Sequence, residues 1–293
     1  MPELPEVETV RRGLAPIMEG AAITRLDQRR PDLRFPFPEN FAARLEGRKV
    51  LRLGRRAKYL ITEIQGGDSL VMHLGMSGRF SITPPRSAKS QIGEYVHAAG
   101  GAKHDHVTLH LSNGVAVTYN DARRFGFMLL IPTAELHAHA LFANLGIEPL
   151  GNELSAAHLA SLAHGRKTDL KAFLLDQRTI AGLGNIYVAE ALHRARLSPK
   201  KSASILAAKS GAPTGHAHRL VPEIKAVLEA AIQAGGSTLR DYRQSDGALG
   251  YFQNSFAVYG RAKEPCPRSD CTGTIRRITQ AGRSTFYCPK CQR

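Results

Sequence analysis

The spacing of apolar residues changes once along the chain, near Pro132, and this change strongly limits the folds open to it. Before Pro132, apolar residues alternate with polar ones, the period expected of half-buried strands. The clearest hairpin pairs residues 106–111 with 115–119 across Asn113-Gly114, a dipeptide that favours a two-residue turn. Further strands are predicted at 49–53, 58–64 and 69–74. The chain before Pro132 is therefore expected to be a mainly antiparallel β domain.

After Pro132 the apolar residues recur at helical spacing, as Leu220, Ile224 and Val227 do. This period predicts helices at 134–145, 155–164, 168–177, 186–196 and 219–234. A separate helix over 5–18, ending near Gly20, precedes the β domain. Residues 84–104 and 199–217 are rich in small and polar residues and are predicted to be loops. The pattern indicates an α+β chain with more than one domain.

The N-terminus places a backbone amine beside two carboxylates. Removal of Met1 would leave Pro2 as the first residue, followed closely by Glu3 and Glu6. An α-amino group titrates about 2.5 units below a lysine, so more of it is unprotonated at neutral pH. Such an amine can form a Schiff base, which for the secondary amine of Pro2 is a charged iminium. An ordinary helix start, with Pro5 in its first turn and Glu6 facing the helix dipole, is compatible with the same residues.

The charge balance limits the class of partner. Forty Lys and Arg residues against 25 Asp and Glu residues give a net charge of +15. This excess favours a polyanion, with nucleic acid ahead of an anionic membrane, because no apolar run has transmembrane length. No charged and apolar leader marks the chain for export, so a cytoplasmic location is expected.

The four cysteines lie in the last 28 residues and form two close pairs. Four residues separate Cys266 from Cys271, and two residues separate Cys288 from Cys291. Two such thiolate pairs can complete a tetrahedral structural zinc site, with a short hairpin between them. A set of free or redox-active cysteines is the alternative. Since the zinc site would use all four thiols, a catalytic metal is not expected.

Taken in order, these motifs closely resemble the bacterial formamidopyrimidine-DNA glycosylase family, the 8-oxoguanine DNA glycosylases and AP lyases. The similarity extends over nearly the whole chain. Beyond the N-terminus and the cysteines, it rests on RRAKYL at 55–60, HLGMSG at 73–78, KHDHV at 103–107, DARRFG at 121–126, GLGNIY at 182–187, QSDG at 244–247 and VYGR at 258–261.

The resemblance implies three domains. An N-terminal antiparallel β-sandwich with the N-terminal helix would form the catalytic domain over 2–131. A helix–two-turns–helix DNA-binding domain would follow over 132–256, with a lesion-recognition loop near 237–251. A four-cysteine zinc hairpin would occupy 257–293 and hold one structural zinc ion. The resemblance also implies a monomer that binds double-stranded DNA containing oxidised purines.

The same resemblance implies a mechanism in which the damaged base is flipped out of the duplex and Pro2 attacks the anomeric carbon of its sugar. Glu3 would be the general acid/base that opens the sugar ring, and Glu6 would position the terminus. Lys58 matches the proton donor for β-elimination, and Arg283 matches an arginine that grips a phosphate and is linked to δ-elimination. Surface charge is the alternative for Glu6 and Lys58, and a turn residue is the alternative for Arg283.

Three further residues match the family's gap-filling set, which replaces the extruded base in the stack. They are Met76, Arg123 and Phe125, of which Arg123 would contact the orphaned partner base. Core packing is the alternative for Met76 and Phe125.

His104, Arg166 and Asn185 match family positions that contact DNA. Asn185 lies at a predicted helix start, where N–H groups can hold a phosphate, and an ordinary helix cap uses the same geometry. Lys167 is an alternative to Arg166 as the contact residue.

Two departures and two rival functions accompany this interpretation. The family commonly has two residues between the first cysteines, where this chain has four, and a proline where this chain has Ala122. A sister class resembling endonuclease VIII has the same architecture but prefers oxidised pyrimidines. A non-enzymatic zinc-finger DNA-binding protein would share the charge and the cysteines, but it would not need Pro2-Glu3 together with Lys58.

Overall fold

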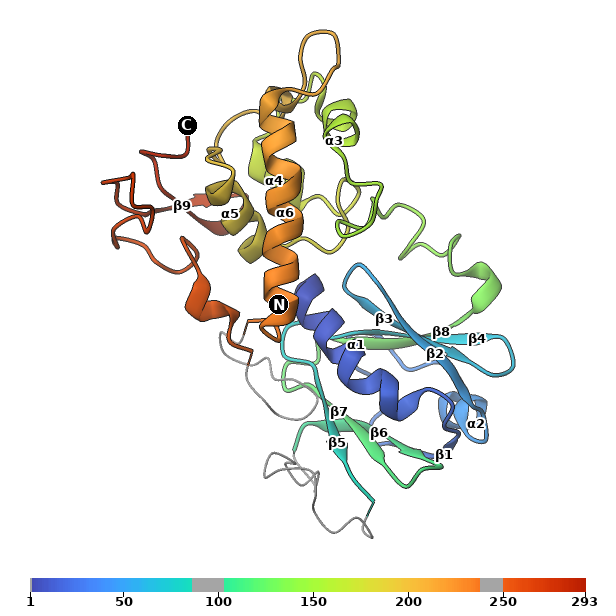
Figure 1. Cartoon of the computed structure of the whole chain (residues 1–293). Helices are drawn as coiled ribbons and strands as arrows, with labels where there is room; N and C mark the ends of the chain where they lie inside the picture. The colour runs from blue at the N-terminus through green and yellow to red at the C-terminus, as the bar shows by residue number, and fades with distance from the viewer. Residues whose placement is uncertain (1, 86–102, 238–249) are drawn as a thin grey trace. The chain divides into compact units, whose positions relative to one another are not determined.

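The computed structural model describes residues 2–85, 103–237 and 250–293, and Figure 1 shows the course of the chain. It folds into two compact units. Unit 1 contains Met1–Ala143 and Ala234–Tyr251, and unit 2 contains Asn144–Gln233 and Phe252–Arg293.

Unit 1 is built on two four-stranded antiparallel sheets, the β-sandwich implied by the sequence. One sheet contains, in spatial order, β1 (Ile23–Gln28), β6 (Asp105–Leu111), β7 (Ala116–Asn120) and β5 (Arg79–Thr83). The other contains β2 (Val50–Arg56), β3 (Tyr59–Ile64), β4 (Asp68–His73) and β8 (Phe127–Pro132). The predicted strands at 49–53, 58–64, 69–74, 106–111 and 115–119 are confirmed within a few residues at each end.

The predicted N-terminal helix is α1 (Leu4–Met18), and it lies beside the sheets of unit 1 (Figure 1). Its apolar side, which includes Val7, Val10 and Leu14, is buried in one cluster with side chains from both sheets. Burying such side chains is the main favourable term in folding, roughly 1.5–3 kcal/mol for each. The core therefore fixes α1, and with it the first residues of the chain.

The sequence patterns missed four elements of unit 1 and wrongly assigned one helix. Strands β1, β5 and β8 and the short helix α2 (Phe41–Leu45) were not predicted. The helix expected over 134–145 is wrong, because only Thr133–Glu135 forms a turn of 3₁₀ helix. There, the Nδ1 atom of His139 accepts the backbone N–H of Leu141 at 3.2 Å, which takes that donor away from a continuing helix.

Unit 2 contains four α-helices within its described residues. They are α3 (Ala156–Ala163), α4 (Leu170–Leu175), α5 (Asn185–Arg194) and α6 (Gly215–Gln233). Side chains cap two of them, since Ser155 accepts the N–H of His158 and Asp169 accepts that of Ala172. These four helices confirm the predictions at 155–164, 168–177, 186–196 and 219–234, although α6 begins four residues earlier.

The end of the chain is a two-stranded hairpin of β9 (Arg276–Gln280) and β10 (Arg283–Tyr287). Its two-residue turn, Ala281-Gly282, has φ angles of 46° and 72°. Two positive φ values are typical of the type I′ turn that suits the twist of a hairpin. Arg283 is therefore the first residue after the turn.

Parts of two predicted loops lie outside the described residues, namely 86–102 of the 84–104 loop and 238–249 of the lesion-recognition loop. Within the described ranges, no helix has both the length and the apolar character needed to cross a membrane.

Candidate active site and metal centre

The N-terminal residues are held in place by a reciprocal cap at the start of α1. Glu3 is the N-cap residue, and its side chain and that of Glu6 each accept a backbone N–H of the other residue. The bond from the Glu3 N–H to Glu6 Oε2 is 2.8 Å long. Pro2 is buried, and Glu3 and Glu6 are only 3% and 2% exposed. The carboxylates beside Pro2 are thus enclosed, unlike the exposed charges of an ordinary helix start.

Glu6 also connects α1 to a residue far along the chain. Its Oε1 atom accepts the backbone N–H of Ser237 at 2.9 Å and the Ser237 hydroxyl at 3.0 Å. Both residues belong to unit 1. Glu6 therefore holds the backbone of Glu3 and of Ser237 at the same time.

Lys58 is 7% exposed and lies in the tight turn between β2 and β3, not in the strand as expected. Ala57, before it, has a φ of 53°, a left-handed conformation that makes the turn sharp. A lysine is seldom buried without a partner or a function. The structure thus does not support the alternative that Lys58 is a surface charge.

His73, at the end of β4, is a half-buried histidine that stays neutral at pH 7. Its Nδ1 atom accepts the N–H of Gly75 at 3.0 Å, and its ring stacks on Phe127 with the centroids 5.3 Å apart. Burial, and then the positive charges of Lys58 and Arg34, lower the pKa of His73 to about 4. Nδ1 is therefore an acceptor at neutral pH, and the proton is on Nε2.

We expect His73 to make the fold less stable as the pH falls from 6.5 towards 4. In this window the unfolded histidine binds a proton and the folded one does not, so acid favours unfolding. When the pH falls from 7 to 5, the free energy of unfolding should drop by about 2 kcal/mol less in His73→Phe than in the wild type. Urea unfolding of both proteins at the two pH values measures this difference. A ring ¹⁵N titration of the folded protein with a midpoint near 6.5 would contradict the prediction.

Asp121 connects the two loops that carry the predicted gap-filling residues. Its buried carboxylate accepts the Ser77 hydroxyl at 2.6 Å, the Gly126 N–H at 2.8 Å, and the Tyr119 hydroxyl and Arg123 N–H at 3.2 Å. The segments touch directly as well, because a Cβ at Gly75 would lie 2.3 Å from the nitrogen of Gly126. In the sequence, Asp121 stood out only as the first residue of the DARRFG motif, and its role as an acceptor for both loops was not predicted.

Met76, Arg123 and Phe125 lie on these two loops. Met76 is half-buried in the turn after β4, whereas Phe125 is 47% exposed. The Arg123 guanidinium lies 4.8 Å from the centre of the Phe125 ring. His104 joins the same group, because its carbonyl accepts the Asp121 N–H at 3.0 Å. The structure thus brings four predicted contact residues together, and Phe125 is not a core residue.

In unit 2, two side chains donate to the carbonyl of Ser284, the residue after Arg283. Asn185, the first residue of α5, donates from Nδ2 to this carbonyl at 3.0 Å. Lys171, 1% exposed on α4, donates to the same carbonyl at 3.1 Å and to the Thr285 hydroxyl at 2.6 Å. Together they hold the strand that carries Arg283. Lys171 was missed, although a lysine within the apolar helix LKAFLL was a visible signal.

Glu190 on α5 is a second buried charge that the sequence analysis missed. It is 1% exposed and accepts the backbone N–H groups of Ala257, Val258 and Tyr259 at 2.8–3.0 Å. It thereby holds part of the VYGR motif against α5.

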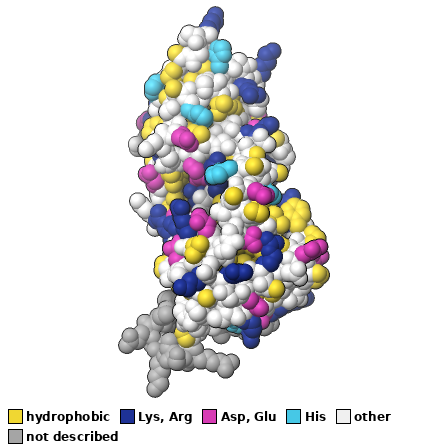
Figure 2. Space-filling view, turned by 90° about the vertical axis from the view of Figure 1, so that its right-hand side faces the viewer, with side chains coloured by type: hydrophobic (Ala, Val, Ile, Leu, Met, Phe, Trp, Pro, Cys, Tyr) yellow, Lys and Arg dark blue, Asp and Glu magenta, His cyan; other side chains and the backbone are white. Residues whose placement is uncertain are grey.

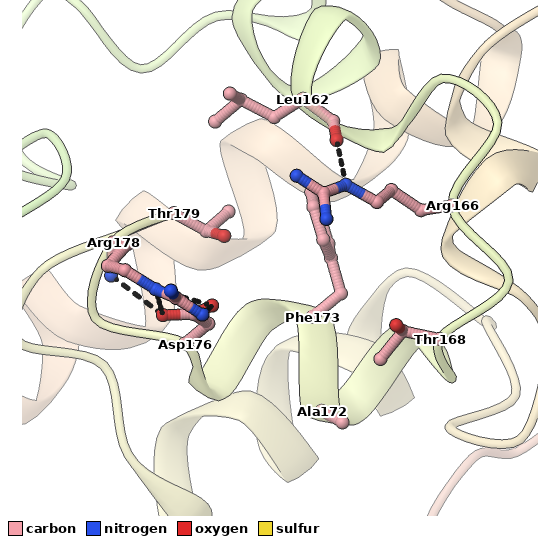
Figure 3. A pocket seen from close by; sticks show the side chains of 8 residues that line it. All are labelled: Leu162, Arg166, Thr168, Ala172, Phe173, Asp176, Arg178 and Thr179. Atoms are coloured by element: carbon pink, nitrogen blue, oxygen red, sulfur yellow. Dashed lines mark hydrogen bonds and ion pairs between the residues drawn. The ribbon is translucent and has the colours of Figure 1, made fainter.

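Arg166 lines a pocket of about 320 Å³ in unit 2 (Figure 3). Its Nε donates to the Leu162 carbonyl at 3.4 Å, as the dashed line in Figure 3 marks. Arg178 and Asp176 form an exposed ion pair at another edge of the pocket. In the separate view of Figure 2, Lys and Arg side chains lie among acidic and apolar ones without forming one continuous patch.

The four cysteines form a cluster in which all Sγ atoms lie within 4.8 Å of one another. Sγ of Cys266 is 3.8 Å from that of Cys291, and Sγ of Cys271 is 3.6 Å from that of Cys288. A tetrahedral zinc with Zn–S bonds of about 2.3 Å sets its sulfur ligands about 3.8 Å apart. Burial and the neighbouring thiols raise the pKa of Cys291. Forming its thiolate is therefore unfavourable without a metal, and a bound dication would stabilise the thiolate. The cluster fits one structural zinc ion.

We expect Cys288→Ser to lose the zinc ion and to weaken DNA binding by about tenfold or more, which is about 1.4 kcal/mol or more. The reason is that the hairpin carrying Arg283 depends on the metal cluster. Elemental analysis and fluorescence anisotropy with a damaged duplex measure the two effects. Ser269→Ala, an exposed change between the first two cysteines, is the control. Unchanged affinity in the zinc-free protein would show that the finger is not needed for DNA binding.

Comparison with known proteins gives matches over nearly the whole chain. Three family models match: the formamidopyrimidine-DNA glycosylase N-terminal domain at residues 1–128, the formamidopyrimidine-DNA glycosylase H2TH domain at 145–243, and the zinc finger found in FPG and IleRS at 263–293. Formamidopyrimidine-DNA glycosylases of Beijerinckia indica and Methylocella silvestris are 63% and 59% identical, with all of each chain covered.

Solved structures of the same family are also similar to this chain. The MutM (FPG) protein of Thermus thermophilus is 38% identical with a TM-score of 0.81, covering 99% of this chain and 98% of its own. The Lactococcus lactis Fpg bound to DNA containing an abasic site is 33% identical with a TM-score of 0.83, and 99% of each chain is covered. The chain therefore belongs to the formamidopyrimidine-DNA glycosylase family, the DNA glycosylases and AP lyases that act on oxidised purines in base-excision repair.

Proposed function

We propose that this chain removes oxidised purines from double-stranded DNA through the amine of Pro2 and then cuts the strand at the abasic site. The observation that carries the proposal is the enclosed N-terminus, where a buried proline lies beside two buried carboxylates held in a reciprocal cap. Related Lactococcus lactis proteins are bound to DNA containing N7-benzyl-Fapy-dG or an abasic site, which supports the same class of partner.

In the first step, the Pro2 nitrogen forms a bond to C1′ of the flipped nucleotide, and the bond from C1′ to the base breaks. Glu3 gives a proton to the ring oxygen as the C1′–O4′ bond opens, which leaves the iminium. Glu6 positions the N-terminus, because its carboxylate accepts the Glu3 N–H and so fixes the backbone beside the amine.

The iminium withdraws electrons from the sugar, so that loss of a C2′ proton expels the 3′ phosphate and a second elimination expels the 5′ phosphate. Lys58 is the proton donor in the β-elimination, and Arg283 holds the phosphate linked to the δ-elimination. Met76, Arg123 and Phe125 fill the gap in the duplex, while His104, Arg166 and Asn185 contact the DNA backbone. The protein acts as a cytoplasmic monomer.

Borohydride trapping on a duplex with one 8-oxoguanine opposite cytosine tests this proposal. Borohydride reduces the iminium to a stable amine, so peptide mapping by mass spectrometry should find the adduct on Pro2 of protein lacking Met1. A duplex without the lesion is the control. Tight binding of the damaged duplex with no adduct, although the proline terminus is free, would reject the lyase mechanism for this lesion. Trapping only on an oxidised pyrimidine would instead favour the endonuclease VIII-like specificity.

A further inference from the structure

A histidine of α5 lies against Cys266, in the first cysteine pair of the metal cluster. His193, near the end of α5, is 3% exposed, and its Nε2 atom lies 3.4 Å from Sγ of Cys266. α5 packs against β10 within unit 2, and Figure 1 shows it beside the hairpin. A buried titratable side chain thus touches a zinc ligand without being a ligand itself.

The direction of this hydrogen bond follows from the chemistry of the partner. A cysteine bound to zinc is a thiolate, which has lone pairs and no proton. Only the imidazole can then donate, and it does so from Nε2–H. Four thiolates around one dication leave a net negative charge, and a donated hydrogen bond disperses part of it over the imidazole.

Residues between Cys266 and Cys271 also contact the backbone of α5 at its end, where His193 lies. The Arg268 guanidinium donates to the carbonyls of His193 at 2.9 Å and of Arg194 at 2.7 Å. These carbonyls lie in the last turn of α5, where that of His193 also accepts the Arg196 N–H at 3.1 Å. Asp270 forms an ion pair with Arg196, just beyond the helix. Arg268 and Asp270, two of the four residues between Cys266 and Cys271, therefore anchor the cysteine loop to the end of α5.

The second cysteine pair is anchored to the same place. Gln292 accepts the Cys288 N–H at 2.8 Å and donates to the Leu197 carbonyl at 2.9 Å. Both halves of the metal site are thus attached to residues 193–197, and His193 is the one among these contacts whose side chain reaches a sulfur atom.

We propose that His193 is a positioning residue of the zinc site, which donates a hydrogen bond from Nε2 to the Cys266 thiolate and strengthens binding of the metal. Its loss removes the donor and exposes the thiolate to protonation and to competing ligands. Changes to such supporting residues commonly weaken metal binding by about 10–100-fold. Glutamine can place its Nε2 in a similar position, so His193→Gln should keep most of the zinc affinity.

The test compares zinc affinity in the full-length protein by competition with a chromogenic chelator. We expect His193→Phe to bind zinc about 10–100-fold more weakly than the wild type and His193→Gln to stay close to it. His164→Phe is the matched control, because His164 is an exposed histidine of the same unit whose ring bonds to the Lys209 carbonyl, away from the cysteines. In the cobalt-substituted proteins, His193→Phe should also shift the sulfur-to-metal charge-transfer band.

A measurement on the wild-type protein keeps the proposal testable if His193→Phe does not fold. With ¹¹³Cd in the site, the Hε2 proton of His193 should show a scalar coupling to the metal through the Cys266 sulfur. A detected coupling supports the hydrogen bond. An Hε2 resonance without coupling, or a His193→Phe protein with wild-type zinc affinity and an unshifted cobalt band, would overturn the proposal.

Discussion

Glu3→Gln is expected to slow base excision by about 10²–10⁴-fold, the usual contribution of a general acid/base. Glutamine has the size of glutamate and keeps a carbonyl oxygen that can accept the Glu6 N–H, so the cap at the start of α1 should persist. It cannot donate a proton to the ring oxygen of the sugar and take it back. Because Glu3 is 3% exposed, water is a poor substitute for the missing carboxylate.

The measurement is a single-turnover rate of 8-oxoguanine release, together with the affinity for the same duplex. Glu8→Gln is the matched control, since Glu8 lies on the same helix and pairs with Arg11, Arg12 and Arg55 away from the cap. We expect Glu3→Gln to keep its affinity and lose its rate, and Glu8→Gln to keep both. A Glu3→Gln rate within tenfold of the wild type would remove Glu3 from the chemistry.

Asp121→Asn is expected to lower the free energy of unfolding by about 3 kcal/mol or more, because hydrogen bonds to a charged group contribute about 1.5–3 kcal/mol each. The carboxylate is fully buried and accepts four donors, two at each oxygen. An amide has one accepting oxygen, so two donors would face an NH₂ group. Either the Arg123 N–H or the Gly126 N–H would then lose its acceptor at this side chain, and the Ser77 or Tyr119 hydroxyl beside it would have to turn to accept from the amide.

Urea unfolding measures the stability change, and binding of a damaged duplex measures the effect on the loops. Asp105→Asn is the control, because Asp105 lies in the same unit and accepts a bond from the Asn120 amide at 2.8 Å. We expect it to cost about 1 kcal/mol or less, because the new asparagine still offers one accepting oxygen to that amide. In Asp121→Asn the Arg123 and Phe125 loop should also lose its fixed shape, so DNA affinity should fall under conditions where the protein is still folded. An unchanged unfolding midpoint would show that the loop does not depend on this carboxylate.

The elements that the sequence predicted well are those with a one-sided apolar pattern. α1 and α6 each bury one face, and the 106–111 and 115–119 hairpin has a clear turn dipeptide, so local pattern and tertiary packing agree. β1 was missed because its ITRLDQ sequence buries few positions, and β8 because FMLLIP is apolar throughout and has no alternation. In 134–145 the sparse apolar residues were given a helical period that the backbone does not follow.

In the candidate site, the sequence did not predict the residues that support the motif residues. The motif residues were found because the chain resembles a known family, but their supports were not. Asp121, Lys171 and Glu190 bind backbone groups that are far away in sequence or unpredictable in conformation, such as the Ser284 carbonyl. A sequence shows that a charged residue stands in an apolar segment, and it does not show which backbone group that residue will meet. The 238–249 segment remains a prediction from the family alone.

The bonds between Glu6 and Ser237 have a consequence for synthesis of the protein on the ribosome. The first unit is discontinuous, because the chain leaves it after Ala143 and returns at Ala234. The carboxylate beside the N-terminal cap thus receives two of its donors from a residue translated near the end of the message. A nascent chain that has not yet reached Ser237 can form the sheets and expose its proline, but it lacks these contacts. Full assembly of the surroundings of Pro2 therefore waits until most of the polypeptide has been made.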